Sequence, residues 1–218
     1  MKHTLMATLF ASCLIMPMAA AIGDDAEILP PGGVEIRINR VDAVPPYRAE
    51  LGDDGKPVLL TRTQIVAELR EITGLALNDQ GGELLPPPFP RVFCRFETYS
   101  VVNHRWFESL IHWCTGQVRF LGLTYRRENW DCDDYSMAYN AIADIAQLRA
   151  QTPAPPRLVG RLIVQQKVAW AGTPVTGAHE VITFRSGKSW WVCEPQNGTK
   201  ILLKNYPNRE HVREIMFN

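Results

Sequence analysis

The sequence predicts an α+β fold, in which helices come first and antiparallel strands follow. Apolar residues recur at helical spacing up to the proline-rich stretch 152–156 and at a spacing of two after it. A two-residue turn predicted at Ser186-Gly187 would join two of the later strands as a hairpin. Helices and antiparallel strands that are segregated along a chain are typical of α+β domains rather than of doubly wound ones.

The composition is that of a globular chain with no strong charge bias. Its 218 residues, 46% of them hydrophobic, are enough for one sizeable domain with a core of its own. The chain carries 23 basic and 23 acidic residues, and no basic patch stands out. We therefore expect no nucleic-acid partner. No apolar run after the N-terminus is long enough to span a membrane, and the sequence does not indicate an oligomeric state.

Residues 1–21 are predicted to be a cleavable signal peptide. A short basic start precedes an apolar stretch from Leu5 to Met18, and three alanines offer a cleavage site after Ala21. The protein is therefore expected to be secreted or periplasmic. The alternative is a lipoprotein signal that uses Cys13.

Residues 22–90 form a region rich in proline and glycine, which could be an accessory lobe, a prosegment or an N-terminal wrap. A short strand is predicted at 34–38, where apolar and polar residues alternate. A helix is predicted from Thr61 to Ile72. Thr61 and Gln64 can form a capping box at its start, and Gly74 can end it.

Residues 91–218 are predicted to form the main domain. After an extended segment at 91–99, a helix is expected at 103–114, with Asn103 as its cap and Thr115-Gly116 as its stop. The central helix covers 131–150, and a stripe of Met137, Ala141, Ile145 and Leu148, with Ala138 and Ile142 alongside, is expected to face the core. Extended segments are predicted at 117–125, 157–170 (centred on 162–164), 178–184, 189–194 and 200–203.

Cys132 stands at the start of the central helix, a position that favours a reactive thiolate. Free N–H groups and the helix macrodipole both stabilise negative charge there. The neighbouring carboxylates Asp131, Asp133 and Asp134 suit the same turn as helix caps. The same three side chains could also bind calcium, because calcium prefers oxygen ligands.

The predicted hairpin supplies a partner pair for this cysteine. Counting outward from the Ser186-Gly187 turn places His179 directly opposite Glu194, with Cβ atoms about 4.5–5.5 Å apart. A carboxylate beside His179 would fix the tautomer of its ring and leave the other nitrogen free to face a thiol. We therefore predict a catalytic triad of Cys132 as nucleophile, His179 as base and Glu194 as the orienting group. A core histidine, a solvated glutamate and a buried structural thiol are the alternative interpretations.

These stretches resemble the papain-like and transglutaminase-like cysteine peptidase superfamily. The similarity covers about Asn103 to Leu203 and rests on Asp131-Cys132-Asp133-Asp134-Tyr135, Ala178-His179 and Glu194-Pro195-Gln196. The motifs are closest to bacterial transglutaminase-like cysteine proteinases and to the protease domain of Marasmius oreades agglutinin. The resemblance implies a nucleophile at the N-terminus of a central helix packed on an antiparallel sheet. It also implies a Cys-His-Glu triad and, from the agglutinin, activation by calcium.

The sequence departs from the papain-like pattern in the loop before the nucleophile. Papain-like enzymes place an oxyanion-binding Gln a few residues before the cysteine, and residues 125–130 contain none. The backbone N–H of Cys132 and the indole of Trp130 are the oxyanion donors expected instead.

Four cysteines remain after removal of the signal peptide, and export would allow disulfides between them. If Cys132 is a free nucleophile, we predict that Cys94 pairs with Cys114, because both precede the reactive helix.

Three functions are compatible with these residues. The first is a thiol hydrolase that needs no cofactor and cleaves an amide bond, expected in a peptide or protein substrate, through an acyl-thioester on Cys132. The second is a transglutaminase, in which an amine takes the acyl group. The third is a catalytically inactive, calcium-binding interaction protein of the cell envelope.

Overall fold

The structure is a computed structural model that describes residues 43–79, 89–120, 131–150, 154–175 and 177–217. The predicted signal peptide and the predicted strand at 34–38 lie outside the described residues. Val44–Asn218 form one compact unit. The described part of residues 22–90 packs within this unit.

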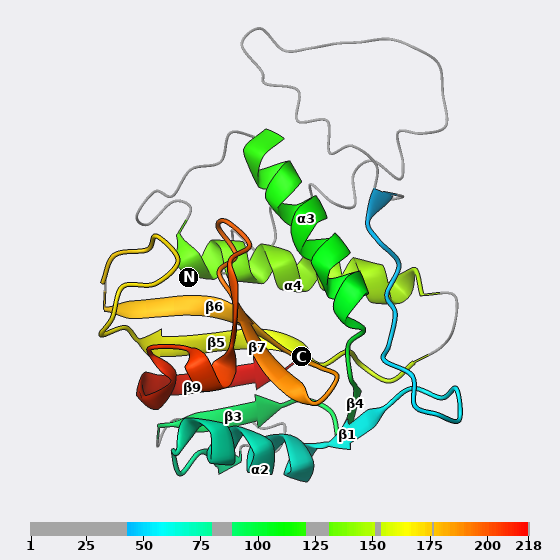
Figure 1. Ribbon diagram of the computed structural model, residues 1–218, viewed down its shortest axis with the longest axis horizontal. Coiled ribbons are helices and arrows are strands. Elements are labelled where there is room, and N and C mark those ends of the chain that lie inside the picture. Colours follow the sequence, from blue (N-terminus) through cyan, green and yellow to red (C-terminus); the bar gives the residue numbers. More distant parts are fainter. Residues whose placement is uncertain (1–42, 80–88, 121–130, 151–153, 176, 218) are drawn as a thin grey trace, which may run out of the picture. The chain divides into compact units, whose positions relative to one another are not determined.

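A seven-stranded mixed sheet is the centre of this unit (Figure 1). Its strands, in spatial order, are β2 (Asn78–Asp79), β3 (Arg91–Cys94), β9 (Val212–Phe217), β5 (Val159–Gln165), β6 (Ala178–Ser186), β7 (Ser189–Cys193) and β8 (Lys200–Leu202). The predicted strands β5 to β8 are confirmed. The last strand, β9, was not predicted. It pairs antiparallel with β5 and parallel with β3.

Helices cover both faces of the sheet. The helix α2 (Arg62–Thr73) contributes Ile65 and Leu69 to one hydrophobic cluster, while α3 (His104–Phe120) and α4 (Cys132–Leu148) pack in a second cluster (Figure 1). Val181 lies in the first cluster and Ile182 in the second, as alternation along a strand requires. This arrangement confirms the α+β class. The remaining elements are a two-stranded sheet of β1 (Leu59–Thr61) with β4 (Thr98–Ser100), and the short helices η3 (Leu203–Asn205) and η4 (Arg209–His211).

The start and end of α2 follow the predicted local signals. Thr61 is the N-cap, and its side chain and that of Gln64 form a capping box. Gly74 ends the helix with φ +71, a left-handed conformation that glycine adopts without a Cβ clash, and its N–H donates to the carbonyl of Arg70 at 2.9 Å.

The helix α3 is longer than predicted. Asn103 caps it as expected, with its Oδ1 accepting from the N–H of Trp106 at 3.1 Å. The helix then continues through Thr115 and Gly116 to Phe120, so the predicted stop and the extended segment expected from residue 117 are wrong up to residue 120. Thr115 donates its hydroxyl to the Ile111 carbonyl at 2.9 Å, which makes it compatible with a helix interior. Residues 121–125 lie outside the described residues.

The helix α4 begins at Cys132, with Asp131 as its N-cap, close to the predicted boundaries. The predicted core stripe is wrong at Leu148, which is 86% exposed, and at Met137, Ala141 and Ile145, which are only partly buried. It is confirmed at Ala138 and Ile142, which are buried. The buried face of α4 is rotated relative to the predicted stripe. Its apolar residues are Tyr135, Ala138, Tyr139, Ile142, Ala143 and Ala146.

The predicted disulfide is also wrong. Cys94 lies on β3 in the first hydrophobic cluster and Cys114 on α3 in the second, and both are free thiols. Each is buried as a small apolar side chain, which is a common role for cysteine.

Within the described residues, no helix combines the length and the apolar character that crossing a bilayer would require.

Gly160 of β5 occupies a position where a side chain does not fit. A Cβ there would collide with the carbonyl oxygen of Met216 and the ring of Phe217 on β9. We expect Gly160→Ala to lower the free energy of unfolding by about 1–3 kcal/mol, as measured by urea denaturation. The matched control is Gly116→Ala on the exposed side of α3, where nothing lies within 4 Å; it should stabilise the protein by about 0.5–1 kcal/mol. A Gly160→Ala variant as stable as the wild type would contradict the close approach of β5 and β9.

Candidate functional site

The hairpin of β6 and β7 turns one residue later than predicted. Ser186 pairs with Ser189 and Phe184 with Trp191, so the turn is Gly187-Lys188 and the predicted register is wrong. Gly187 has φ +55 at the first turn position, which explains why the turn uses this residue rather than Ser186.

His179 and Glu194 nevertheless lie on one face of the sheet. The turn kept its length of two residues and moved along the chain by one, so the predicted direct pair became a diagonal pair with the same orientation. The Nε2 atom of His179 lies 2.9 Å from Oε2 of Glu194, and the two side chains are 2% and 0% exposed. Because an ionised carboxylate only accepts hydrogen bonds, Nε2 carries the proton and Nδ1 is left as the basic nitrogen. Among the described residues, no hydrogen bond engages Nδ1.

Glu194 is held by further donors. The hydroxyl of Thr173 donates to Oε2 at 3.3 Å, and the backbone N–H of Gln196 donates to Oε1 at 3.3 Å. The backbone of Glu194 is fixed by Thr199 and Gly198, at 2.9 and 2.8 Å. A buried carboxylate needs such additional hydrogen bonds, because its attraction to one partner does not repay the loss of hydration.

Cys132 is the first residue of α4, and α4 packs on β6 and β5. Its thiol lies within reach of the backbone N–H of Glu180, the residue that follows His179. Glu180 and His179 point to opposite faces of β6, since side chains alternate along a strand. Among the described residues, the thiol makes no hydrogen bond with the His179 ring. Of the three predicted residues, His179 and Glu194 are hydrogen-bonded to each other, and Cys132 lies beside β6, the strand that carries His179.

The surroundings of Cys132 disfavour its thiolate. The pKa of the thiol is raised to about 11, chiefly by burial and also by the carboxylates of Asp131, Asp133 and Glu180, against the opposing effect of the Glu180 N–H. This is opposite to the lowered pKa expected at a helix N-terminus. The local carboxylates and the loss of hydration outweigh the helix dipole.

The three aspartates have different roles. Asp131 and Asp134 form the capping arrangement of α4, with the N–H of Asp131 donating to Oδ2 of Asp134 at 3.2 Å. Burial raises the pKa of Asp133 to about 6, and a hydrogen bond to the Asp131 carboxyl adds to this effect.

Asp131 and Asp133 fit a calcium site only in part. Their oxygens and the sulfur of Cys132 all lie within 4.8 Å of one another. Calcium takes about six to eight oxygen ligands, and a thiol is not one of them. The described residues around Cys132 therefore offer two carboxylate ligands, and the rest of the coordination would have to come from elsewhere.

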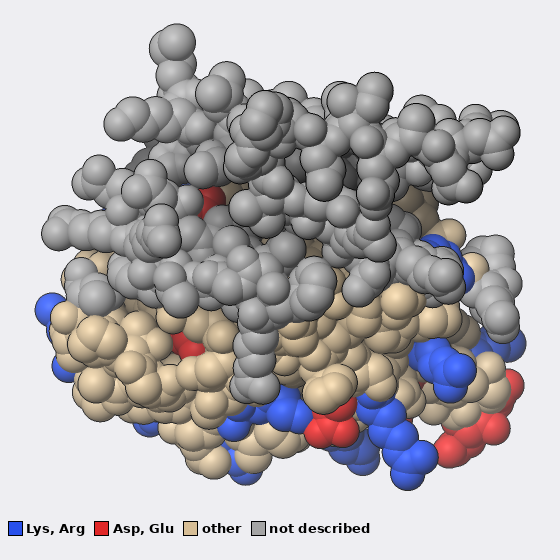
Figure 2. Space-filling model, turned by 90° about the horizontal axis from the view of Figure 1, so that it is seen from above, with Lys and Arg blue, Asp and Glu red and all other residues tan. Residues whose placement is uncertain are grey.

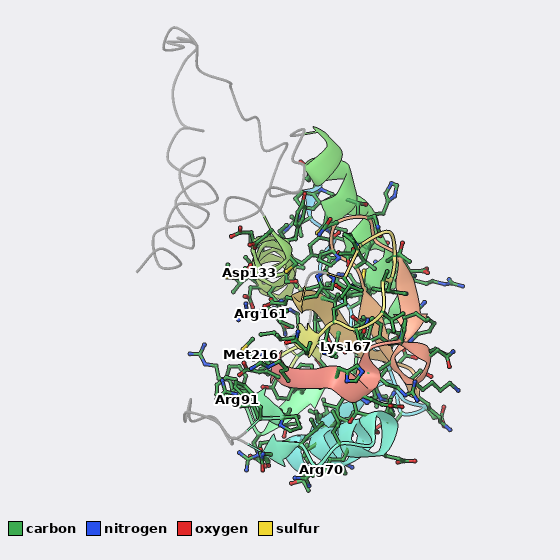
Figure 3. All side chains as sticks on the ribbon, turned by 90° about the vertical axis from the view of Figure 1, so that its left-hand side faces the viewer. Arg70, Arg91, Asp133, Arg161, Lys167 and Met216 are labelled. Atoms are coloured by element: carbon green, nitrogen blue, oxygen red, sulfur yellow. The ribbon has the colours of Figure 1, made fainter. Side chains whose placement is uncertain are left out.

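A row of charged side chains runs from the start of α4 across the sheet. Glu180 accepts from Arg161 at 3.2 Å, and Glu214 on β9 accepts from Arg91 at 2.6 Å. In Figure 3, Asp133 lies at the start of α4, with Arg161, Met216 and Arg91 following one another across the strands. Burial raises the pKa of Glu180 to about 7, an effect larger than the opposing one of Arg161.

Glu180 and Thr173 belong to the site and were missed by the sequence analysis. The position of Glu180 directly after His179 on a predicted strand was the available signal, because it places the carboxylate on the opposite face. Nothing in the sequence around Thr173 indicates its contact with Glu194, which depends on tertiary structure.

The predicted oxyanion donor Trp130 lies outside the described residues. The described surface visible in Figure 2 carries basic and acidic side chains together along one edge. One cavity among the described residues, of about 310 Å³, lies between α2 and the β6–β7 hairpin, and another, of about 270 Å³, lies between α3 and residues 197–200. Neither is lined by Cys132, His179 or Glu194.

No protein-family model matches the chain, and no curated protein matches it. Solved structures do resemble it. One is Polyporus squamosus lectin bound to the human-type influenza-binding epitope Neu5Acα2-6Galβ1-4GlcNAc, with 17% identity, a TM-score of 0.49 and coverage of 73% of this chain and 49% of that one. Another is a PSL1a–E64 complex, with 20% identity, a TM-score of 0.50 and coverage of 73% and 50%. The second likeness shows a shared fold, and this chain spans about half the length of both proteins.

We expect the protein to lose stability between about pH 4.5 and pH 7 because of Glu180. Its pKa is raised from 4.5 to about 7, so the unfolded chain ionises first and gains stability relative to the folded one as the pH rises. The loss should be at most about 3 kcal/mol and complete above the folded-state pKa. Glu180→Gln should flatten this dependence in urea denaturation, whereas the exposed Glu71→Gln should not. An unchanged slope in Glu180→Gln would contradict the raised pKa.

The alkylation of Cys132 by iodoacetamide should be slow at neutral pH. Because the pKa of the thiol is raised to about 11, the rate should increase about tenfold per pH unit below that value. Asp133→Asn removes a negative charge beside the sulfur and should accelerate alkylation severalfold at pH 8, while the exposed Asp53→Asn should not. Peptide mass spectrometry distinguishes Cys132 from the three buried thiols. A rate that is already constant above pH 6 would mean that the resting protein holds a thiolate.

Proposed function

We propose that the chain is a thiol hydrolase that cleaves amide bonds in peptides, with Cys132 as nucleophile, His179 as base and Glu194 as orienting residue. The observation that carries this proposal is the fully buried His179–Glu194 pair, at 2.9 Å, on the strand that receives the start of α4. A histidine held by a buried carboxylate, with no hydrogen bond to its other ring nitrogen among the described residues, supports a role as general base.

The reaction would begin with the thiol of Cys132 protonated. Nδ1 of His179 takes the thiol proton as the sulfur attacks the carbonyl carbon, and Glu194 stabilises the imidazolium that forms. The imidazolium then returns the proton to the leaving amine, which leaves an acyl-thioester on Cys132. Water, deprotonated by Nδ1, hydrolyses this thioester and regenerates the thiol. The backbone N–H of Cys132, at the helix N-terminus, would donate to the oxyanion.

The raised pKa of Cys132 favours transfer of the proton during attack over a resting ion pair. Three carboxylates surround the thiol, and a thiolate would have to form against them. The proposal therefore requires the thiol and Nδ1 to come within hydrogen-bond distance when substrate is bound, since resting geometry at such sites is often looser.

The finer fold assignment belongs to the same proposal. A nucleophile at the N-terminus of a helix packed on an antiparallel sheet is the arrangement of papain-like and transglutaminase-like enzymes, and α4 on β5 and β6 agrees with it. The PSL1a structure that shares the fold is described as a complex with E64, which makes this reagent a natural probe for Cys132.

The expected setting of the activity is outside the cytoplasm. Export through a signal at residues 1–21 remains a prediction, as does the role of residues 22–90 as an accessory lobe or prosegment. Calcium bound at Asp131 and Asp133 would supply positive charge beside Cys132 and so offset the carboxylates that raise the pKa of its thiol.

Cys132→Ala should reduce hydrolysis of a fluorogenic peptide library by at least about 10³-fold without changing the melting temperature, because the nucleophile is lost. Labelling at residue 132 by iodoacetamide or by E64, an epoxide that alkylates thiols, should disappear in the same variant. His179→Asn is the matched variant. It should lose hydrolysis but keep the iodoacetamide site, because the thiol is still present.

Retained hydrolysis in Cys132→Ala would refute the proposal. Incorporation of a labelled amine in place of acid release would identify the transglutaminase reaction. A wild-type protein that does neither, with calcium present, would favour the inactive interaction protein.

A further inference from the structure

A tight turn at residues 170–173 lies against the carboxylate of Glu194. The N–H of Thr173 donates to the carbonyl of Trp170 at 2.9 Å, and the N–H of Trp170 donates back to the carbonyl of Thr173 at 3.2 Å. This closed pair of hydrogen bonds directs the Thr173 hydroxyl onto Oε2 of Glu194 at 3.3 Å. Oε2 therefore has two donors, His179 and Thr173.

The backbone of this turn is strained. Ala171 has φ +53 and Gly172 has φ +82, so both central residues adopt left-handed conformations. Ala171 is the one non-glycine residue with positive φ among the described residues. An alanine avoids this region because of its Cβ, and strain of this kind persists where the surroundings over-determine it, commonly at functional sites.

The surroundings of the turn are built to hold it. The side-chain Nδ2 of Asn197, three residues beyond Glu194, donates to the carbonyl of the strained Ala171 at 2.7 Å. The ring of Trp170 packs edge-on against Tyr206, with centroids 5.1 Å apart. At the base of the loop, Asn208 accepts from the N–H groups of Lys167 and Val168 at 2.8 and 2.9 Å.

We propose that Thr173 is a positioning residue for Glu194, and that the strained turn exists to hold its hydroxyl in place. This inference rests on the proposed triad, in which Glu194 orients His179. The hydroxyl keeps Oε2 directed at Nε2, which in turn keeps the proton on Nε2 and Nδ1 free as the base. Thr173 does not touch the reacting atoms and acts only through Glu194.

The test uses Thr173→Val, which keeps the shape of the side chain and removes the donor, and Thr173→Ser, which restores the donor. Thr173 is only partly buried, so neither change disturbs the core. In the full-length protein with ¹⁵N-labelled histidines, wild type and Thr173→Ser should show a single Nε2–H tautomer for His179. Thr173→Val should show a mixture of the two neutral tautomers. The signals of His179 are assigned by their loss in His179→Asn.

Hydrolysis provides the second measurement. We expect kcat/KM to fall about tenfold in Thr173→Val and to recover in Thr173→Ser, the size of effect that one hydrogen bond to a charged group can have. Asn197→Asp, which removes the donor to Ala171 but keeps the acceptor for Thr199, should reproduce the tautomer mixture. A Thr173→Val protein that keeps the single Nε2–H tautomer would overturn the inference. The NMR result does not depend on activity, so a failure of the proposed hydrolase would be recognised separately by the Cys132→Ala experiment.

Discussion

The buried hydrogen bond between His179 and Glu194 is the interaction on which the candidate site depends. A carboxylate with no exposed surface is stable only when its oxygens are supplied with donors, and here those donors come from three segments: β6, the turn at 170–173 and the chain that follows β7. Each segment is fixed in turn by its own backbone bonds. The segments around the ends of β6 and β7 therefore supply the hydrogen bonds that the buried carboxylate of Glu194 requires.

Cys132, the proposed nucleophile, has a contrasting environment. Two carboxylates beside Cys132 have raised pKa values, Asp133 of about 6 and Glu180 of about 7, because burial removes their hydration and, to a lesser extent, because other carboxylates lie close to them. The ring of His179, the proposed base, is held by the carboxylate of Glu194, while the thiol of Cys132 is kept neutral by neighbours that would repel a thiolate. In this arrangement the thiol of Cys132 would stay protonated, and therefore unreactive, until a base can accept its proton.

Local signals were predicted from the sequence better than tertiary ones. The caps of α2 could be placed to within a residue, because a capping box and a left-handed glycine act through adjacent atoms. The His179–Glu194 contact was predicted from a wrong register, and it held because the turn moved without changing length. The buried face of α4, the extension of α3 beyond Gly116 and the strand β9 were missed, since each depends on what packs against it. The contact of Thr173 depends on a strained turn that composition does not reveal.

The strand β6 lies between the two hydrophobic clusters, and its successive side chains face them alternately. His179 is followed on β6 by Glu180, whose side chain lies on the opposite face of the strand and near Cys132. Glu194, which accepts from His179, lies near Tyr206 of the cluster that contains α2 and also near Tyr139 of the cluster that contains α3 and α4. A change in the packing of either cluster would therefore alter the distance between the thiol of Cys132 and the ring of His179. If the proposed triad is correct, repacking alone would weaken or restore activity with all three side chains still present.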